Sequence, residues 1–227
     1  MIQRYISNEL FHFVGKQRKE NEQYEIFKKI LTDCKLGTGN PHFKTIKSDD
    51  KWPLSSNESY IPEMVCFCDI PLGDIKLHIK KYSSFGISFL KTYLITKGAN
   101  PVWYISKNST IGPNPNDLWT KNNKYHDEKH EYVQKLEKYM KDTKSFDDRL
   151  KNEILCYFLH IFSYMQFFEA EKEDLDKENY YMEREWRLCG VLNFENIDNI
   201  YRIILPKSTI SQFRKDFPNY LGQISYA

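Results

Sequence analysis

The chain has 227 residues, a length suited to one sizeable hydrophobic core. A hydrophobic content of 41%, with 16 Tyr and 15 Phe, excludes a disordered chain and predicts a packed aromatic interior. Lys and Arg total 33 and Asp and Glu 31, a net charge of +2, so no overall field points to nucleic acid or to an anionic membrane.

The first half of the chain predicts strands that alternate with helices. Apolar and aromatic runs predict strands at 10–14, 64–68, 85–90 and 101–105. Apolar residues at helical spacing predict helices over 23–36, 72–82 and 92–97. Between the first helix and the second strand, residues 37–59 are rich in Gly, Pro, Ser, Asn and Asp and predict a long loop.

The second half opens with a polar stretch. Residues 114–147 predict a helical insertion, with an amphipathic helix at 131–141. A long helix over 146–171, an acidic turn and a strand over 181–191 follow. The remaining elements are short: a strand over 200–205, a helix capped by Ser208 that runs to Phe217, and a last strand over 223–226 at a sheet edge.

These elements predict a single α+β domain over residues 1–227. Its sheet is expected to be mixed or antiparallel, with helices packed against it and the polar insertion at about 114–147. The alternation of strands and helices in the first half is the main reason for this fold class.

The compartment is expected to be the cytoplasm. No basic segment leads into an apolar run at the start of the chain, so no secretory signal is predicted. The longest apolar-rich run, 154–168, is shorter than the roughly 20 residues of a membrane span and predicts a buried helix. Five cysteines, an odd number, fit a reducing compartment. We therefore expect no contact with a membrane.

Two glutamates of the 181–191 strand are candidate site residues. Glu183 and Glu185 are two residues apart, so on a strand they share a face. Like charges side by side cost energy unless something uses them. Two interpretations are open: the carboxylates belong to a site, or the segment is an edge strand on which Glu185 pairs with Arg187 in water. Such an exposed pair is worth about 0–1 kcal/mol.

His12 and a pair of later histidines are the other candidates. Either His12 reaches a site with the glutamates, or its imidazole fills an aromatic core with one hydrogen bond. His126 and His130 have the i, i+4 spacing of a helical zinc site. The Glu of a zinc-protease motif does not follow the first of them, and no third ligand is evident, so we expect no metal.

Several segments resemble the AbiGi family of abortive phage infection proteins, the antitoxin side of a phage-defence pair. They are ELFHFVG (9–15), MVCFCDIP (64–71), KYSSFGISF (81–89), KGANPVWYI (97–105), YYMEREWR (180–187) and IILP (203–206). The resemblance implies an antitoxin-like protein whose partner is a cognate toxin or a phage or host macromolecule. Lysines in the polar middle alternate with acidic residues, which does not favour nucleic acid as a direct ligand.

The order of a strand with histidine, a strand Phe-Gly-Ile-Ser-Phe and a late Glu-x-Glu strand also looks like an ADP-ribosyltransferase scaffold. That resemblance implies that His12 holds the ribose of NAD and that Tyr82 or Ser88 lines the nicotinamide pocket. It also implies that Glu185 is catalytic and that Glu183 assists. Cleaving the nicotinamide bond builds positive charge on the ribose, which a nearby carboxylate stabilises.

Two functional classes follow from these resemblances. The first is a regulatory, antitoxin-like AbiGi protein that uses an ADP-ribosyltransferase-like fold to bind a partner. The alternative is an active enzyme that consumes NAD, as an ADP-ribosyltransferase or as an NAD glycohydrolase acting during phage infection.

Overall fold

A computed structural model describes most of the chain outside its polar middle. The described residues are 7–37, 63–106, 138, 161, 163–173, 176 and 179–227. The chain divides into two compact units: unit 1 comprises 1–39, 64–101 and 174–227, and unit 2 comprises 40–63 and 102–173. The long loop expected after Gly37 and nearly all of the insertion at 114–147 lie outside the described residues. The single domain over 1–227 stays a prediction.

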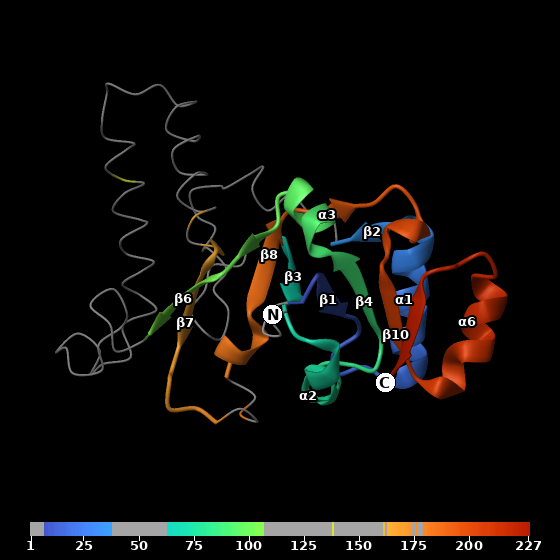
Figure 1. Cartoon of the computed structure of the whole chain (residues 1–227), viewed down its shortest axis with the longest axis horizontal. Helices are drawn as coiled ribbons and strands as arrows, with labels where there is room; N and C mark the ends of the chain where they lie inside the picture. The colour runs from blue at the N-terminus through green and yellow to red at the C-terminus, as the bar shows by residue number, and fades with distance from the viewer. Residues whose placement is uncertain are drawn as a thin grey trace, which may run out of the picture. The chain divides into compact units, whose positions relative to one another are not determined.

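Unit 1 is built on a seven-stranded mixed sheet, in the order β11-β10-β4-β1-β3-β8-β5 (Figure 1). Its strands are β1 (Glu9–Phe13), β3 (Met64–Cys68), β4 (Gly86–Leu90), β5 (Asn100–Pro101), β8 (Glu185–Cys189), β10 (Arg202–Leu205) and β11 (Gln223–Tyr226). β10 and β11 run parallel, and the other neighbours run antiparallel. A mixed sheet with packed helices confirms the α+β prediction.

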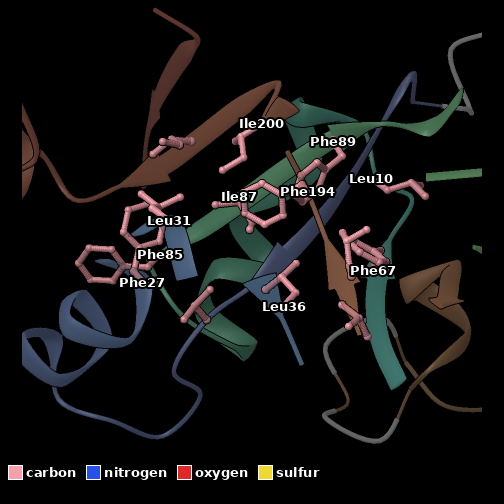
Figure 2. Close-up of a cluster of buried hydrophobic side chains, with 14 of the residues drawn as sticks. Leu10, Phe27, Leu31, Leu36, Phe67, Phe85, Ile87, Phe89, Phe194 and Ile200 are labelled. Carbon is pink, nitrogen blue, oxygen red and sulfur yellow. The ribbon is translucent and has the colours of Figure 1, made fainter. Parts of the chain in front are cut away.

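One face of this sheet, the core face, carries the main hydrophobic core. Alternate strand positions point to it, as the two-residue period of a strand requires, and those residues are buried: Leu10, Phe67, Ile87, Phe89, Leu188 and Ile203. Helix α1 (Glu20–Asp33) contributes Tyr24, Phe27 and Leu31, and helix α6 (Ile210–Asp216) contributes Phe213. Figure 2 shows Phe27, Leu31 and Phe85 gathered beside Ile87. The packed aromatic interior predicted from the composition is thus confirmed.

The opposite face, the α2 face, has a smaller apolar cluster. Helix α2 (Ile75–Lys81), which follows the 3-10 turn η1 (Leu72–Asp74), packs Ile75 in a cluster with Phe11 and Ile204. Other strand positions on this face carry buried polar side chains, among them Glu9, Ser88, Glu185 and Arg187. Buried polar groups need partners, so this face is where a site is to be sought.

The remaining elements of unit 1 are short. Strand β2 (Lys35–Leu36) pairs with β9 (Leu192–Asn193), and helix α3 (Lys91–Thr96) follows β4. Three more 3-10 turns complete the unit: η3 (Tyr181–Glu183), η4 (Ile197–Asn199) and η5 (Lys207–Thr209). Strand β3 has the predicted bounds, and β11 lies at a sheet edge as predicted.

Unit 2 contains strand β6 (Trp103–Ser106), which pairs in parallel with β7 (Met165–Phe168). These two strands differ from two elements predicted from the sequence. The predicted strand at 101–105 is two strands of different sheets, β5 and β6. The helix predicted over 146–171 is wrong at Met165–Phe168, where the structure has strand β7. Apolar spacing alone does not separate a short strand from a helix, and the ladder to β6 satisfies the backbone of these aromatic residues.

Helix boundaries in unit 1 also differ from the prediction. α1 ends at Asp33, because Cys34 adopts a left-handed conformation with φ of 49° and the next two residues pair as β2. Ser208 does not cap α6, since Thr209 is the residue before that helix and the Ser208 hydroxyl donates to Glu20. No helix in the described part of the chain is long and apolar enough to cross a membrane.

Gly15 is expected to be intolerant of a side chain. Its φ is 79°, and a Cβ there would lie 2.8 Å from Cγ of buried Gln23, whose amide donates to the Gly15 carbonyl at 3.1 Å. We expect Gly15→Ala to lower the free energy of unfolding by roughly 1–3 kcal/mol, through backbone strain and this clash. Gly73→Ala is the matched control, because a Cβ at Gly73 meets nothing within 4 Å. Urea unfolding measures both, and equal effects would contradict the interpretation.

Candidate functional site

Four carboxylates gather around one end of the sheet of unit 1. Antiparallel pairing sets Glu9 opposite Leu90 and Glu185 opposite Cys68, so β1 and β8 begin where β4 and β3 end. Asp69 directly follows β3, and Glu183 lies in η3, just before β8. Each of the four is no more than 7% exposed. We call Glu9, Asp69, Glu183 and Glu185 the acidic quartet.

Each member of the acidic quartet has its own cation. The pairs are Glu9 with Arg202 (3.1 Å), Asp69 with Lys91 (2.7 Å), Glu183 with Lys81 (2.7 Å) and Glu185 with Arg187 (2.8 Å). Burying a lone charge costs several kcal/mol, and a close, hydrogen-bonded counter-charge offsets much of that cost. The quartet is therefore neutralised from within the protein.

Glu185 is held by two hydrogen bonds from one guanidinium group. Arg187 Nε lies 2.9 Å from Oε1 and Nη2 lies 2.8 Å from Oε2. The pairing of these residues on one face is thus confirmed, but β8 lies between β3 and β5, and both side chains are buried. The interpretation of this segment as an exposed edge strand is wrong, because β8 is paired with a strand on each side. A two-point bond of this kind fixes both the position and the charge of Glu185.

Glu183 is bound by Lys81 and Tyr82, which adjoin at the end of α2. The Tyr82 hydroxyl donates to Oε1 of Glu183, and so does Nζ of Lys81. Burial and the negative charge of Glu183 raise the pKa of Tyr82, so the phenol stays protonated and serves as a donor. This contact places Glu183 on the α2 face, the same face as Glu185.

The segment before β8 is a turn rather than the predicted strand. Arg184 has a φ of 42°, a left-handed conformation that costs a residue with a side chain roughly 1–2 kcal/mol. With this geometry the carbonyls of Glu183 and Arg184 both accept from the Asp69 amide, at 3.3 Å each. Backbone strain of this kind occurs in functional sites, but it also occurs in turns that have only a structural role.

Cys68 lies among these carboxylates as a neutral thiol. It faces Glu185 across the ladder and is buried. Burial raises its pKa well above the usual value, and the charges of Glu183 and Glu185 raise it further. Only the thiolate is a strong nucleophile or metal ligand, so Cys68 behaves as a small buried side chain.

His12 lies on the core face, opposite the face that carries Glu183, Glu185 and Tyr82. It shares this face with the buried residues Leu10 and Val14, two positions before and after it, and its ring centre is 5.9 Å from that of Phe67. Its Nδ1 lies 2.8 Å from the carbonyl oxygen of Cys66. Burial lowers the pKa of His12, and this hydrogen bond offsets part of the effect. These contacts are those of an imidazole in an aromatic core with one hydrogen bond.

Ser88 lies on the α2 face but in a different network. Its hydroxyl donates to Glu9, which also accepts from Nε of Arg202, and Nη1 of Arg202 donates to Ser225 at 3.0 Å. Strands β1 and β3 separate Ser88 from β8. Of the five predicted site residues, the structure therefore brings together Glu183, Glu185 and Tyr82. The NAD roles of all five stay predictions.

The sequence alone did not single out Glu9, Asp69 or His78, nor the cations Lys81, Lys91 and Arg202 that pair with the acidic quartet. Glu9 and Arg202 are 193 positions apart, a separation at which no local pattern can signal contact. His78 does follow Ile75 at helical spacing, which could have marked it as buried. No group of histidine, cysteine or acidic side chains in the described ranges is arranged to hold a metal ion. His126 and His130 lie outside those ranges.

Comparison with known proteins gives one family and one curated relative. The family model described as "Putative abortive phage resistance protein AbiGi, antitoxin" matches residues 45–223. A protein of Lactococcus lactis subsp. cremoris, "Abortive phage resistance protein AbiGi", is 40% identical over 67 residues. That alignment covers 27% of this chain and 26% of the relative, so the chain spans about a quarter of the curated relative it matches. No solved structure matches.

We expect Tyr82→Phe to destabilise the protein through Glu183. Loss of the hydroxyl removes a hydrogen bond to a buried carboxylate, and we expect the free energy of unfolding to fall by roughly 1–3 kcal/mol. Tyr93→Phe is the matched control, because the Tyr93 hydroxyl donates at 3.0 Å to the exposed Glu195. That loss should stay below about 1 kcal/mol. Guanidinium unfolding at pH 7 compares the two, and an equal loss would contradict the buried role.

His78 should make stability depend on pH. It is buried beside Phe13 and Tyr82, with each ring centre 6.3 Å away, and among the described residues neither of its ring nitrogens has a hydrogen-bond partner. Burial, and then the charge of Lys81, lowers the pKa of His78 to about 4. The unfolded chain, in which the pKa of His78 is near 6.5, binds its proton first. The stability of the fold is therefore complete above pH 6.5 and falls toward pH 4.

The measurement is urea unfolding of wild type and His78→Phe at pH 7 and pH 5. We expect the variant to show a smaller loss between these pH values, by roughly 1–2 kcal/mol. His12, whose pKa is also lowered, remains in both proteins and contributes equally to each. Parallel losses in the two proteins would show that His78 is not the group that titrates.

Proposed function

The chain belongs to the AbiGi family of abortive phage resistance proteins, and we propose that it acts there as the antitoxin-like component, by binding a partner. The word "antitoxin" in the family's description supports this choice, and so does the state of the predicted catalytic carboxylates. We place the protein in the cytoplasm, with a cognate toxin or a phage or host macromolecule as its partner.

The observation that carries the proposal is the internal neutralisation of Glu183 and Glu185. A transferase carboxylate must be directed at the ribose, where positive charge develops in the transition state. Glu185 is instead bound at both oxygens by Arg187, and Glu183 accepts from Lys81 and Tyr82. A carboxylate already paired with a cation stabilises a second positive charge less, so this arrangement favours a structural role.

The positions of the residues expected around NAD support the same choice. His12 lies on the core face, and Ser88 is bound into the network of Glu9 and Arg202. Residues that bind one dinucleotide must reach it from one side, and these residues do not converge. The side chains present therefore do not fit the NAD site that the transferase resemblance implies, and a similar fold does not by itself imply catalysis.

The alternative function, an enzyme that consumes NAD, has one observation in its favour. Two carboxylates and a tyrosine meet on the α2 face beside Arg184, whose backbone is strained. Buried carboxylates next to a strained turn do occur in active sites, so this alternative is tested directly.

The test uses two variants of the full chain. Glu183→Gln keeps a side-chain oxygen that can accept from Tyr82 and Lys81, and it leaves unpaired only Lys81, whose side chain is 17% exposed to water. The double variant Glu185→Gln with Arg187→Gln removes both charges of its pair. We expect both to protect cells against phage as wild type does, within about threefold in plating efficiency. We also expect purified wild-type protein to release no nicotinamide from NAD, with or without cell extract.

Glu195→Gln is the control for the loss of one negative charge, since Glu195 is exposed and pairs with Lys97. Circular dichroism and thermal unfolding establish that each variant is folded before protection is scored. Folded variants of Glu183 or Glu185 that lose protection, with nicotinamide release by wild type alone, would overturn the proposal in favour of the enzyme.

A further inference from the structure

Four exposed cations of unit 1 follow strands that finish at one end of the sheet, the end where β1, β10 and β11 finish. Phe13 at the end of β1 pairs with Gly86 at the start of β4, and Gly86 pairs with Ile204 near the end of β10. Exposed cations follow these strands: Lys16, Arg18 and Lys19 after β1, and Lys207 after β10. We call these four residues the basic rim.

Contacts between segments hold the basic rim together. Ser208 Oγ donates to Glu20 Oε1 at 3.1 Å, which joins the residue after Lys207 to the residue after Lys19. In Figure 1 the C-terminus, just beyond β11, is seen beside the lower end of α1. Nζ of Lys207 lies 5.5 Å from the ring centre of Tyr226 in β11. Segments from both ends of the chain therefore form one surface.

The basic rim lacks the pairing found in the acidic quartet. Within the described ranges, Lys16, Lys19 and Lys207 form no ion pair. Arg18 approaches Glu22 at 3.9 Å, with both side chains exposed, which is a weak pair. The other carboxylate nearby, Glu20, accepts the hydrogen bond from Ser208. The four cations of the rim outnumber the two nearby carboxylates, Glu20 and Glu22, so positive charge is in excess there.

Aromatic rings lie directly under two of the rim lysines. Nζ of Lys16 is 4.9 Å from the ring centre of Tyr82, and Lys207 covers Tyr226, which is 56% exposed. Protein interfaces have an apolar centre that is depleted of lysine, which does not describe the rim. The exposed apolar side chains Leu90, at the end of β4, and Ile95, in α3, lie toward the opposite end of the sheet. Lysines beside aromatic rings instead suit a phosphate backbone with its bases.

We propose that the basic rim binds nucleic acid through the phosphate backbone, without reading its sequence. Lysines track phosphates as point charges, and Tyr226, which stays 56% exposed although Lys207 lies over its ring, leaves aromatic surface that a base can contact. This proposal rests on the rim residues alone and not on the lysines of the polar middle, which did not favour such a ligand. The rim meets the acidic quartet through Tyr82, whose ring contacts Lys16 and whose hydroxyl donates to Glu183. Binding of nucleic acid at the rim goes beyond the antitoxin-like role.

Fluorescence anisotropy of the full chain tests the proposal. The probes are a labelled poly(dT) and a labelled DNA duplex of about 20 units, titrated between 50 and 200 mM KCl. The variant Lys16→Gln, Lys19→Gln, Lys207→Gln removes three rim charges. We expect it to bind at least 10-fold more weakly than wild type and to lower the slope of log affinity against log salt by about 2 to 3.

The matched control is Lys29→Gln, Lys76→Gln, Lys215→Gln, which removes the same charge from exposed lysines away from the rim. We expect it to change affinity by less than about threefold. Three results would overturn the proposal: no binding at 50 mM KCl, equal losses in the two variants, or an unchanged salt slope. Poly-L-glutamate that competes as well as poly(dT) would assign the rim to an acidic protein instead, and would also overturn it.

Discussion

Burial of four carboxylates around one end of a sheet is the constraint on which the rest of unit 1 depends. Each carboxylate must bring a cation with it, and the cations come from different elements: α2, the start of α3, β8 and β10. Pairs such as Glu9 with Arg202 therefore hold together parts of the chain that are far apart in sequence. Breaking one pair leaves a buried charge alone, which is far more costly than the pair itself is stabilising.

The same constraint separates the charges of unit 1 into two kinds. Inside the α2 face, Glu183 and Glu185 are matched by Lys81 and Arg187 and have little influence on a ligand. On the surface, the basic rim has more cations than carboxylates. This difference between a neutralised interior and a charged surface is part of the basis for the binding role that we propose.

Much of the sheet could be predicted from sequence, because period-two apolar patterns depend only on neighbouring residues. Strand β3 and the strand character of β1, β4, β10 and β11 follow from such patterns. The pattern failed at Met165–Phe168, a short apolar run that reads equally as helix. It also failed at Glu183, where a left-handed Arg184 ends a turn that the charged sequence did not signal.

The sequence by itself determined the α+β class, the aromatic core and the family. It offered the pairing of Glu185 with Arg187 as one of two interpretations, since residues two apart on a strand share a face. Only the tertiary structure decided that this pair is buried and that His12 and Glu185 lie on opposite faces. It also decided that Lys16 and Lys207 share a surface. Such facts depend on which strands become neighbours, and that order is set by packing across the whole sheet rather than by any local pattern.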